Sequence, residues 1–141
     1  GEKGNCYFQL GAQNPNQYTN AIDAFRQVLD SPAADVAARC QASVGLGLVA
    51  ERQAELSTNN ATALLTEALD RYLDVFYAKS NCVREGEQPP SYWRKEAGLK
   101  AARVLSDSLH KREAAEKIYE ELARDYPPLR PFIANRLKKG S

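Results

Sequence analysis

The sequence predicts an all-α fold, and three observations support that prediction. Apolar residues recur every three or four positions over long stretches, which places their side chains on one face of a helix. No stretch alternates apolar and polar residues with the period of two that is typical of a β-strand. Clusters of Pro, Asn and Ser separate the apolar stretches, and such clusters are typical of helix ends. With 141 residues, 43% of them hydrophobic, the chain is long enough for one domain with a core.

The helical face is clearest in three segments, whose apolar positions are as follows. Residues 16–30 carry Ala21, Ile22, Phe25, Val28 and Leu29. Residues 61–79 carry Leu64, Leu65, Ala68, Leu69, Tyr72, Leu73, Val75 and Phe76. Residues 111–126 carry Ala114, Ala115, Ile118, Tyr119, Leu122 and Ala123. Each set lies on one side of a helical wheel, so each segment is predicted to bury one face.

The clusters of Pro, Asn and Ser predict the remaining helix ends. We expect helices over about residues 4–13, 16–30, 33–56, 61–79, 91–108, 111–126 and 128–139. Asn60 and Ser91 are the expected N-caps of two of them. The stretch 80–90 is the one long connection, and we interpret it as an exposed spacer, with a functional loop as the alternative.

A repeat appears when three of these helices are aligned. A small residue recurs every 47 positions, at Ala21, Ala68 and Ala115. The same period relates the aromatic residues Phe25, Tyr72 and Tyr119, and the aliphatic residues Val28, Val75 and Leu122. A small residue allows a neighbouring helix to approach closely, and the aromatic residue one turn later fills the space between successive helix pairs.

This pattern resembles the second helix of a tetratricopeptide repeat, with Pro32 and Pro127 matching the proline that follows it. Leu10-Gly11, Leu46-Gly47 and Ala97-Gly98 look like the Leu-Gly pair of the family's first helix. The resemblance covers most of residues 6–127. It implies a right-handed α-α superhelix, or solenoid, of about three antiparallel helical hairpins plus a C-terminal capping helix.

On this resemblance, residues 1–141 form a single domain. Repeat 1 covers about 4–32, repeat 2 about 33–80, repeat 3 about 91–127 and the capping helix about 128–139. The period of 47 exceeds the 34 residues of the tetratricopeptide family and approaches HEAT-like lengths, so a HEAT-like array is the alternative. The last segment could instead begin a further repeat.

The resemblance also implies a function, because first helices of the family line a concave groove that holds extended peptides. Residues Gln41, Val44 and Glu51 on one first helix, and Tyr92, Lys95 and Arg103 on the next, would then face a peptide or protein partner. The carboxylate-clamp variant of the family needs Asn residues in these helices, and neither 33–56 nor 91–108 contains one.

The charge and hydropathy of the chain argue against some classes of partner. A net charge of +1 provides no electrostatic case for nucleic acid or an anionic membrane, and no apolar run approaches the roughly 18 residues of a membrane span. Residues 91–112 are basic, which indicates either a strip that attracts an acidic peptide or neutralisation by the acidic helix that follows.

The three cysteines are Cys6, Cys40 and Cys82, and together with the single His they do not form a set of zinc ligands. Packed free thiols are favoured over a Cys40–Cys82 disulfide.

No catalytic set is expected. His110 is near Ser106, Asp107 and Ser108, but neighbours at a helix end do not adopt relay geometry easily, so a solvated turn is the better interpretation. We therefore expect a non-enzymatic protein-protein interaction scaffold without cofactor or metal. The alternative is a structural or oligomerising segment of a larger bacterial envelope or assembly protein. The chain is expected to be a fragment, and its compartment stays open between cytoplasm and periplasm.

Overall fold

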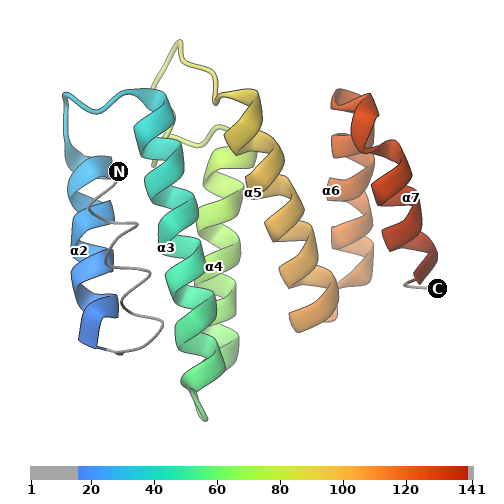
Figure 1. Ribbon diagram of the computed structural model, residues 1–141, viewed down its shortest axis with the longest axis horizontal. Helices are drawn as coiled ribbons and strands as arrows, with labels where there is room; N and C mark the ends of the chain where they lie inside the picture. The colour runs from blue at the N-terminus through green and yellow to red at the C-terminus, as the bar shows by residue number, and fades with distance from the viewer. Residues whose placement is uncertain (1–15, 140–141) are drawn as a thin grey trace.

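The computed structural model describes residues 16–139, and every regular element in that part is helical (Figure 1). In chain order the elements are α2 (Asn16–Asp30), α3 (Val36–Leu56), α4 (Ala61–Phe76), α5 (Ser91–Arg103), the π-helical turn η1 (Val104–Ser108), α6 (Arg112–Asp125), the 3₁₀ turn η2 (Pro127–Leu129) and α7 (Arg130–Lys139). The all-α prediction is confirmed. The helix expected over 4–13 lies outside the described residues.

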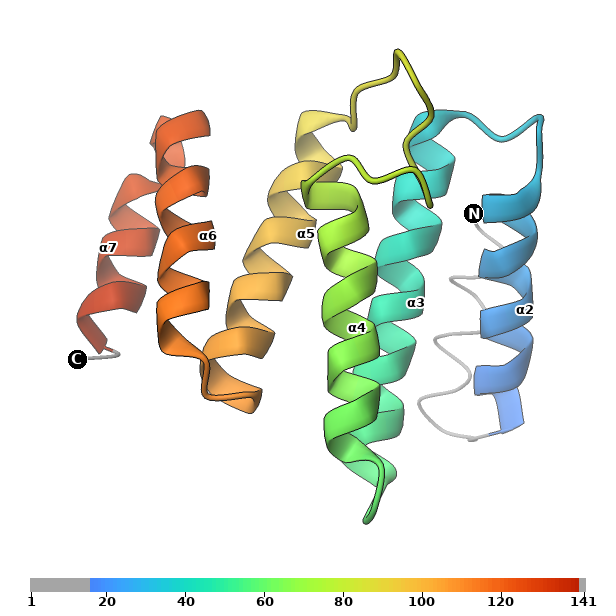
Figure 2. The ribbon, with the colours of Figure 1, turned by 180° about the vertical axis from the view of Figure 1, so that it is seen from behind.

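Consecutive helices run in opposite directions and lie side by side (Figures 1 and 2). The helix α3 packs against α2, α4 and α5, while α6 packs against α5 and α7. In Figure 1, α3, α5 and α7 lie toward the viewer, with α4 and α6 behind them; Figure 2 shows the reverse side. Two layers result, and the chain passes from one to the other at each turn between α3 and α7.

Two helix ends differ from expectation by a few residues. The helix α4 ends at Phe76 rather than near residue 79, because Ala78 adopts a left-handed conformation with φ 53°. Its N–H donates to the Val75 carbonyl and the Lys79 N–H to the Asp74 carbonyl, which is the hydrogen-bond pattern of a Schellman motif. The helix α3 begins at Val36, where the Asp35 carboxylate accepts a hydrogen bond from the Ala38 N–H at 2.8 Å.

The two N-cap predictions are wrong in detail. Asn60 occupies the cap position of α4, but its side chain makes no capping bond, and its own N–H donates to Ser57 Oγ at 2.8 Å. Ser91 is the first residue of α5, and Pro90 occupies the cap position with extended backbone at ψ 142°. The φ preference of proline suits this entry into the helix, and the Pro90 carbonyl accepts the first helical hydrogen bond, from the Arg94 N–H at 2.9 Å.

The residues of the 47-residue period form the centre of the fold. Their small and aromatic members are almost fully buried, and of the aliphatic members Val75 and Leu122 are buried while Val28 is half-buried. The aromatic rings of one layer contact helix backbone of the other at glycines. A Cβ atom added to Gly47 would lie 2.8 Å from Cζ of Tyr72, and one added to Gly98 would lie 2.8 Å from Cε1 of Phe76. Side chains larger than hydrogen would separate these helices.

Candidate functional site

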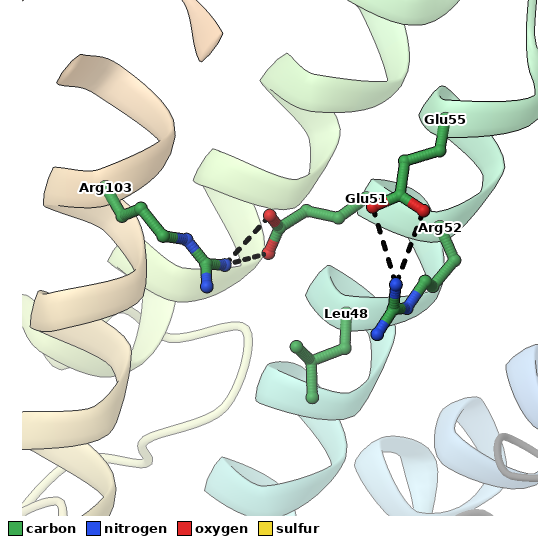
Figure 3. Close-up of a pocket in the computed structure, with 5 residues that line it drawn as sticks. All are labelled: Leu48, Glu51, Arg52, Glu55 and Arg103. Carbon is green, nitrogen blue, oxygen red and sulfur yellow. Dashed lines mark hydrogen bonds and ion pairs between the residues drawn. The ribbon is translucent and has the colours of Figure 1, made fainter. Parts of the chain in front are cut away.

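Two open pockets lie along the helices α3, α5 and α7. The first, the α3–α5 pocket, has a volume of about 300 Å³ (Figure 3). It is lined by Leu48, Glu51, Arg52, Glu55 and Arg103. The α3 positions recur at spacings of three and four, so they share one face of that helix.

The second, the α5–α7 pocket, has a volume of about 440 Å³. It is lined by Glu96, Leu99, Lys100, Arg103, Tyr119, Phe132 and Arg136. Glu96, Leu99 and Arg103 lie on the side of α5 opposite its buried residues Ala97 and Ala101. Arg103 lines both pockets, so the two together cover a surface that crosses three helices.

In the α3–α5 pocket, the Glu51 carboxylate accepts hydrogen bonds from side chains of two other helices. One guanidinium nitrogen of Arg103 donates to both carboxylate oxygens, at 2.9 and 2.8 Å, and Figure 3 shows the two side chains spanning the space between α3 and α5. The buried Tyr72 hydroxyl donates to the same carboxylate from α4. Burial, together with the charge of Glu51, raises the pKa of Tyr72, so this hydroxyl keeps its proton. Glu51 is therefore held from two helices, and it positions Arg103.

The cations of the α5–α7 pocket also have partners. Lys100 bonds Glu96 at 2.7 Å one turn away on α5. Arg136 bonds Asp107 at 3.0 Å and donates to the Tyr119 hydroxyl at 3.2 Å. The exposed fractions of the charged side chains are considerable, at 46% for Arg103 and 32% for Arg136. Ion pairs in such solvated positions stabilise a fold by only about 0–1 kcal/mol each.

The six residues predicted to face a partner are distributed unevenly. Glu51 and Arg103 meet in the α3–α5 pocket, which joins one prediction from each of the two helices. Gln41 is half-buried and lies two turns before Leu48, on the same face of α3. Val44 is only 3% exposed and belongs to the main hydrophobic core, so it offers no surface to a partner in this structure.

The other two lie near the start of α5 and line neither pocket. Tyr92 is 59% exposed and contacts Trp93 edge to face, with ring centroids 4.8 Å apart. Lys95 is directed toward α6, with Nζ 5.5 Å from the centre of the Tyr126 ring. These two side chains form a separate area of surface.

Sequence reasoning missed the contribution of α7. A capping helix is expected over about 128–139, and Ile133 packs into the core as such a helix requires, being 2% exposed. Phe132 instead is 51% exposed and lines the α5–α7 pocket together with Arg136. The available signal was the adjacency of two large apolar residues, because neighbours on a helix point about 100° apart and cannot share one narrow face.

The basic residues of α5 pair with more than one neighbouring helix. Arg94 bonds Asp125 of α6 at 2.9 Å and lies 4.4 Å from the Phe76 ring centre, which fits the predicted neutralisation by the following helix. Arg103, however, pairs with α3. In the last basic run, Arg130 donates to the Ala123 carbonyl at 3.2 Å, near the C-terminal end of α6, where a cation is favoured.

The Ser-His-Asp neighbourhood forms no relay. His110 is exposed in the turn after η1 with φ 56°, and the Asp107 carboxylate is bonded to Arg136. Among the residues that the structure describes, no group of His, Cys, Asp and Glu is arranged to hold a metal ion. Over the same residues, no helix has both the length and the apolar character to cross a membrane.

Comparison with known proteins yields no relative. The chain matches no protein-family model, no curated protein and no solved structure.

Proposed function

We propose that this chain is a non-catalytic protein-interaction module that binds an extended peptide segment of a partner across α3, α5 and α7. The observation that supports the proposal is the continuity of the two pockets. Arg103 lines both, so one ligand would contact three alternate helices on the same side of the molecule. Such a surface suits an extended chain better than a small molecule, because both pockets are partly open to solvent and do not enclose a ligand.

The proposal includes the architecture. A right-handed solenoid of tetratricopeptide-like hairpins with a long repeat accounts for the 47-residue period, the alternating helix directions and the glycine–aromatic contacts. In such an array every second helix faces the same side. The helices α3, α5 and α7 are those helices here, and they carry both pockets.

The partner chemistry follows from the α5–α7 pocket. Three cations, Lys100, Arg103 and Arg136, line it with one carboxylate, Glu96. Arg103 and Arg136 are paired with Glu51 and Asp107, so a ligand carboxylate would compete with these pairs. Leu99, Tyr119 and Phe132 supply apolar surface. An acidic segment with a neighbouring apolar side chain fits both properties. The Arg136–Asp107 pair is partly solvated, with side chains 32% and 51% exposed, so exchanging it for a ligand carboxylate costs little.

A peptide selection tests the proposal. Short random peptides displayed with free C-termini are selected on the immobilised chain, and the enriched peptides are measured by fluorescence anisotropy. We expect acidic peptides with an aliphatic or aromatic residue and a Kd of about micromolar. Arg136→Glu and Phe132→Ser should each weaken binding about tenfold, since each removes one interaction worth about 1.4 kcal/mol.

Two control variants test whether a loss of peptide binding is specific to the two pockets. Lys117→Glu makes the same kind of charge change at an exposed position of α6, and Leu56→Ser removes an apolar side chain that is 64% exposed. Neither residue lines the two pockets, so both variants should bind as wild type. Failure to enrich any peptide would contradict the proposal, as would equal losses in the control variants. Light scattering should show a monomer; a stable dimer that no peptide dissociates would favour the oligomerising alternative.

A further inference from the structure

A third pocket lies between the C-terminal end of α2 and the helix α4. This α2–α4 pocket has a volume of about 370 Å³ and is lined by Arg26, Leu29 and Asp30 of α2, Arg71 of α4 and Asn81 of the segment after α4. It shares no residue with the two pockets along α3, α5 and α7. Figure 2 shows α2 and α4 on either side of α3, which packs against both helices.

The two arginines of this pocket differ from the others in having no protein partner. Every other arginine in the described part of the chain donates a hydrogen bond to an oxygen atom. Arg26 is exposed and Arg71 half-buried, and neither makes a hydrogen bond or a close ion pair with another residue of 16–139. Glu67 lies one turn before Arg71, at a favourable spacing for an ion pair within a helix, and still does not pair with it. The two guanidinium groups without a protein partner therefore line the same cavity.

The wall of the pocket opposite α2 is held in place by contacts outside the cavity. Arg84 donates to the Ser31 and Pro32 carbonyls, at 3.0 and 3.3 Å, and so holds the segment after α4 against the end of α2. The Asn81 amide nitrogen donates to the buried Asp74 carboxylate at 3.2 Å. This bond uses one amide hydrogen, so the side chain keeps a further donor and an acceptor for a ligand.

The lining carries two positive charges and one negative charge. Arg26 and Arg71 repel each other, and Asp30 offsets only one of them. Asp74 is 5% exposed and does not belong to the lining. Guanidinium groups bind carboxylates through two parallel hydrogen bonds, and a carboxylate binds an ammonium group. A ligand with two carboxylates, one ammonium group and a short apolar stem beside Leu29 complements this lining.

We propose that the α2–α4 pocket binds an acidic amino acid, with its two carboxylates on Arg26 and Arg71 and its ammonium group on Asp30. A dicarboxylate without an amino group would leave Asp30 unpaired beside a negative ligand, and a neutral amino acid would leave one guanidinium group unpaired. The volume is near the lower end of the range of about 300–1,000 Å³ for small-molecule sites, which suits a ligand of this size. The proposal is independent of the peptide-binding function.

A nuclear magnetic resonance titration of the ¹⁵N-labelled full chain tests the proposal. The buffer is low in salt, because salt screens partly exposed charges. L-Glutamate is the probe, and glutarate, which has the same carbon chain without the amino group, is its matched control. We expect saturable shifts of the Asn81 side-chain amide signals with a Kd of about 1 mM for glutamate, and binding of glutarate about tenfold weaker. Asp30→Asn should remove this preference, since neither ligand then gains an ion pair at that position.

Arginine variants identify the carboxylate contacts. Arg26→Met and Arg71→Met should each weaken glutamate binding about tenfold and leave helicity and Tm unchanged, because neither side chain bonds the protein. Arg112→Met is the matched control, since it removes an exposed cation of α6 that lines none of the three pockets, and it should bind as wild type. The absence of any shift at about 20 mM glutamate would overturn the proposal, as would an equal loss in Arg112→Met. Glutarate binding as tightly as glutamate to the wild-type chain would overturn it too, because the ammonium group would then make no contact.

Discussion

Replacing Gly47 by alanine tests the contact on which the packing of α3 and α4 depends. The added Cβ would lie 2.8 Å from Cζ and 2.9 Å from Cδ1 of Tyr72, and closer still to Cε1. Separations below 3.0 Å require a displacement. The Tyr72 ring is 0% exposed and its hydroxyl is bonded to Glu51, so the ring cannot turn aside without breaking that bond.

Two opposing contributions determine how much Gly47→Ala changes the free energy of unfolding. Overpacking a buried site costs about 1–3 kcal/mol, and the fixed ring places this site near the upper limit. Alanine in a helix interior is favoured over glycine by about 1 kcal/mol. We therefore expect Gly47→Ala to lower the free energy of unfolding by about 2 kcal/mol and Tm by about 7 °C.

Urea unfolding followed by circular dichroism measures the change, and a double-mutant cycle identifies its cause. Removing the ring with Tyr72→Leu should abolish the clash and leave only the helix gain of alanine, so the double variant should be more stable than the sum of the single changes implies, by about 3 kcal/mol. Gly86→Ala is the contrasting control, since no atom lies within 4 Å of its Cβ and only the positive φ of 83° should cost stability, by about 1 kcal/mol. An additive cycle, or a Gly47→Ala chain as stable as wild type, would refute the reasoning.

Three further predictions concern the start of α3. Asp35→Ala should cost about 1 kcal/mol in urea unfolding, because it removes the bond to the Ala38 N–H; an unchanged midpoint would exclude a capping role. Arg39→Met should cost about 2 kcal/mol, because it leaves the buried Cys82 carbonyl without its donor; a neutral or stabilising result in the same assay would show that this carbonyl finds another partner. Hydrogen bonding from Arg39 lowers the pKa of Glu87, so the Tm advantage of wild type over Glu87→Gln should be full at pH 7 and disappear as the pH falls through the folded-state pKa, below about 4.3. A difference that persists unchanged at pH 3 would contradict that sign.

Helix positions could be predicted from the sequence because they depend on local patterns. The expected range 16–30 matches α2, and the expected range 61–79 is long by three residues at one end. That error has a specific cause: Ala78 takes the left-handed cap position that glycine usually marks, and its side chain carries no signal for it. Solvated turns such as that at His110 were likewise predictable from polar composition.

The candidate surface was predictable only in part. The family resemblance put Glu51 and Arg103 among the residues expected to face a partner, but their bond joins α3 to α5 and depends on how those helices sit side by side. Val44 was also predicted to face a partner, but its side chain is buried. It lies on the same side of α3 as Leu48 and Glu51, and contact with the core decides that it is buried.

The sequence by itself determined where the helices are, which face of each is apolar and that small and aromatic residues recur at one period, because these properties belong to neighbouring residues. The tertiary structure decided which aromatic ring rests on which glycine, that Arg103 spans two pockets and that Arg39 bonds the Cys82 carbonyl. Those pairings join segments far apart in the chain. Their partners are selected by close packing and by the bonding needs of buried groups such as Arg39, which only the assembled helices can satisfy.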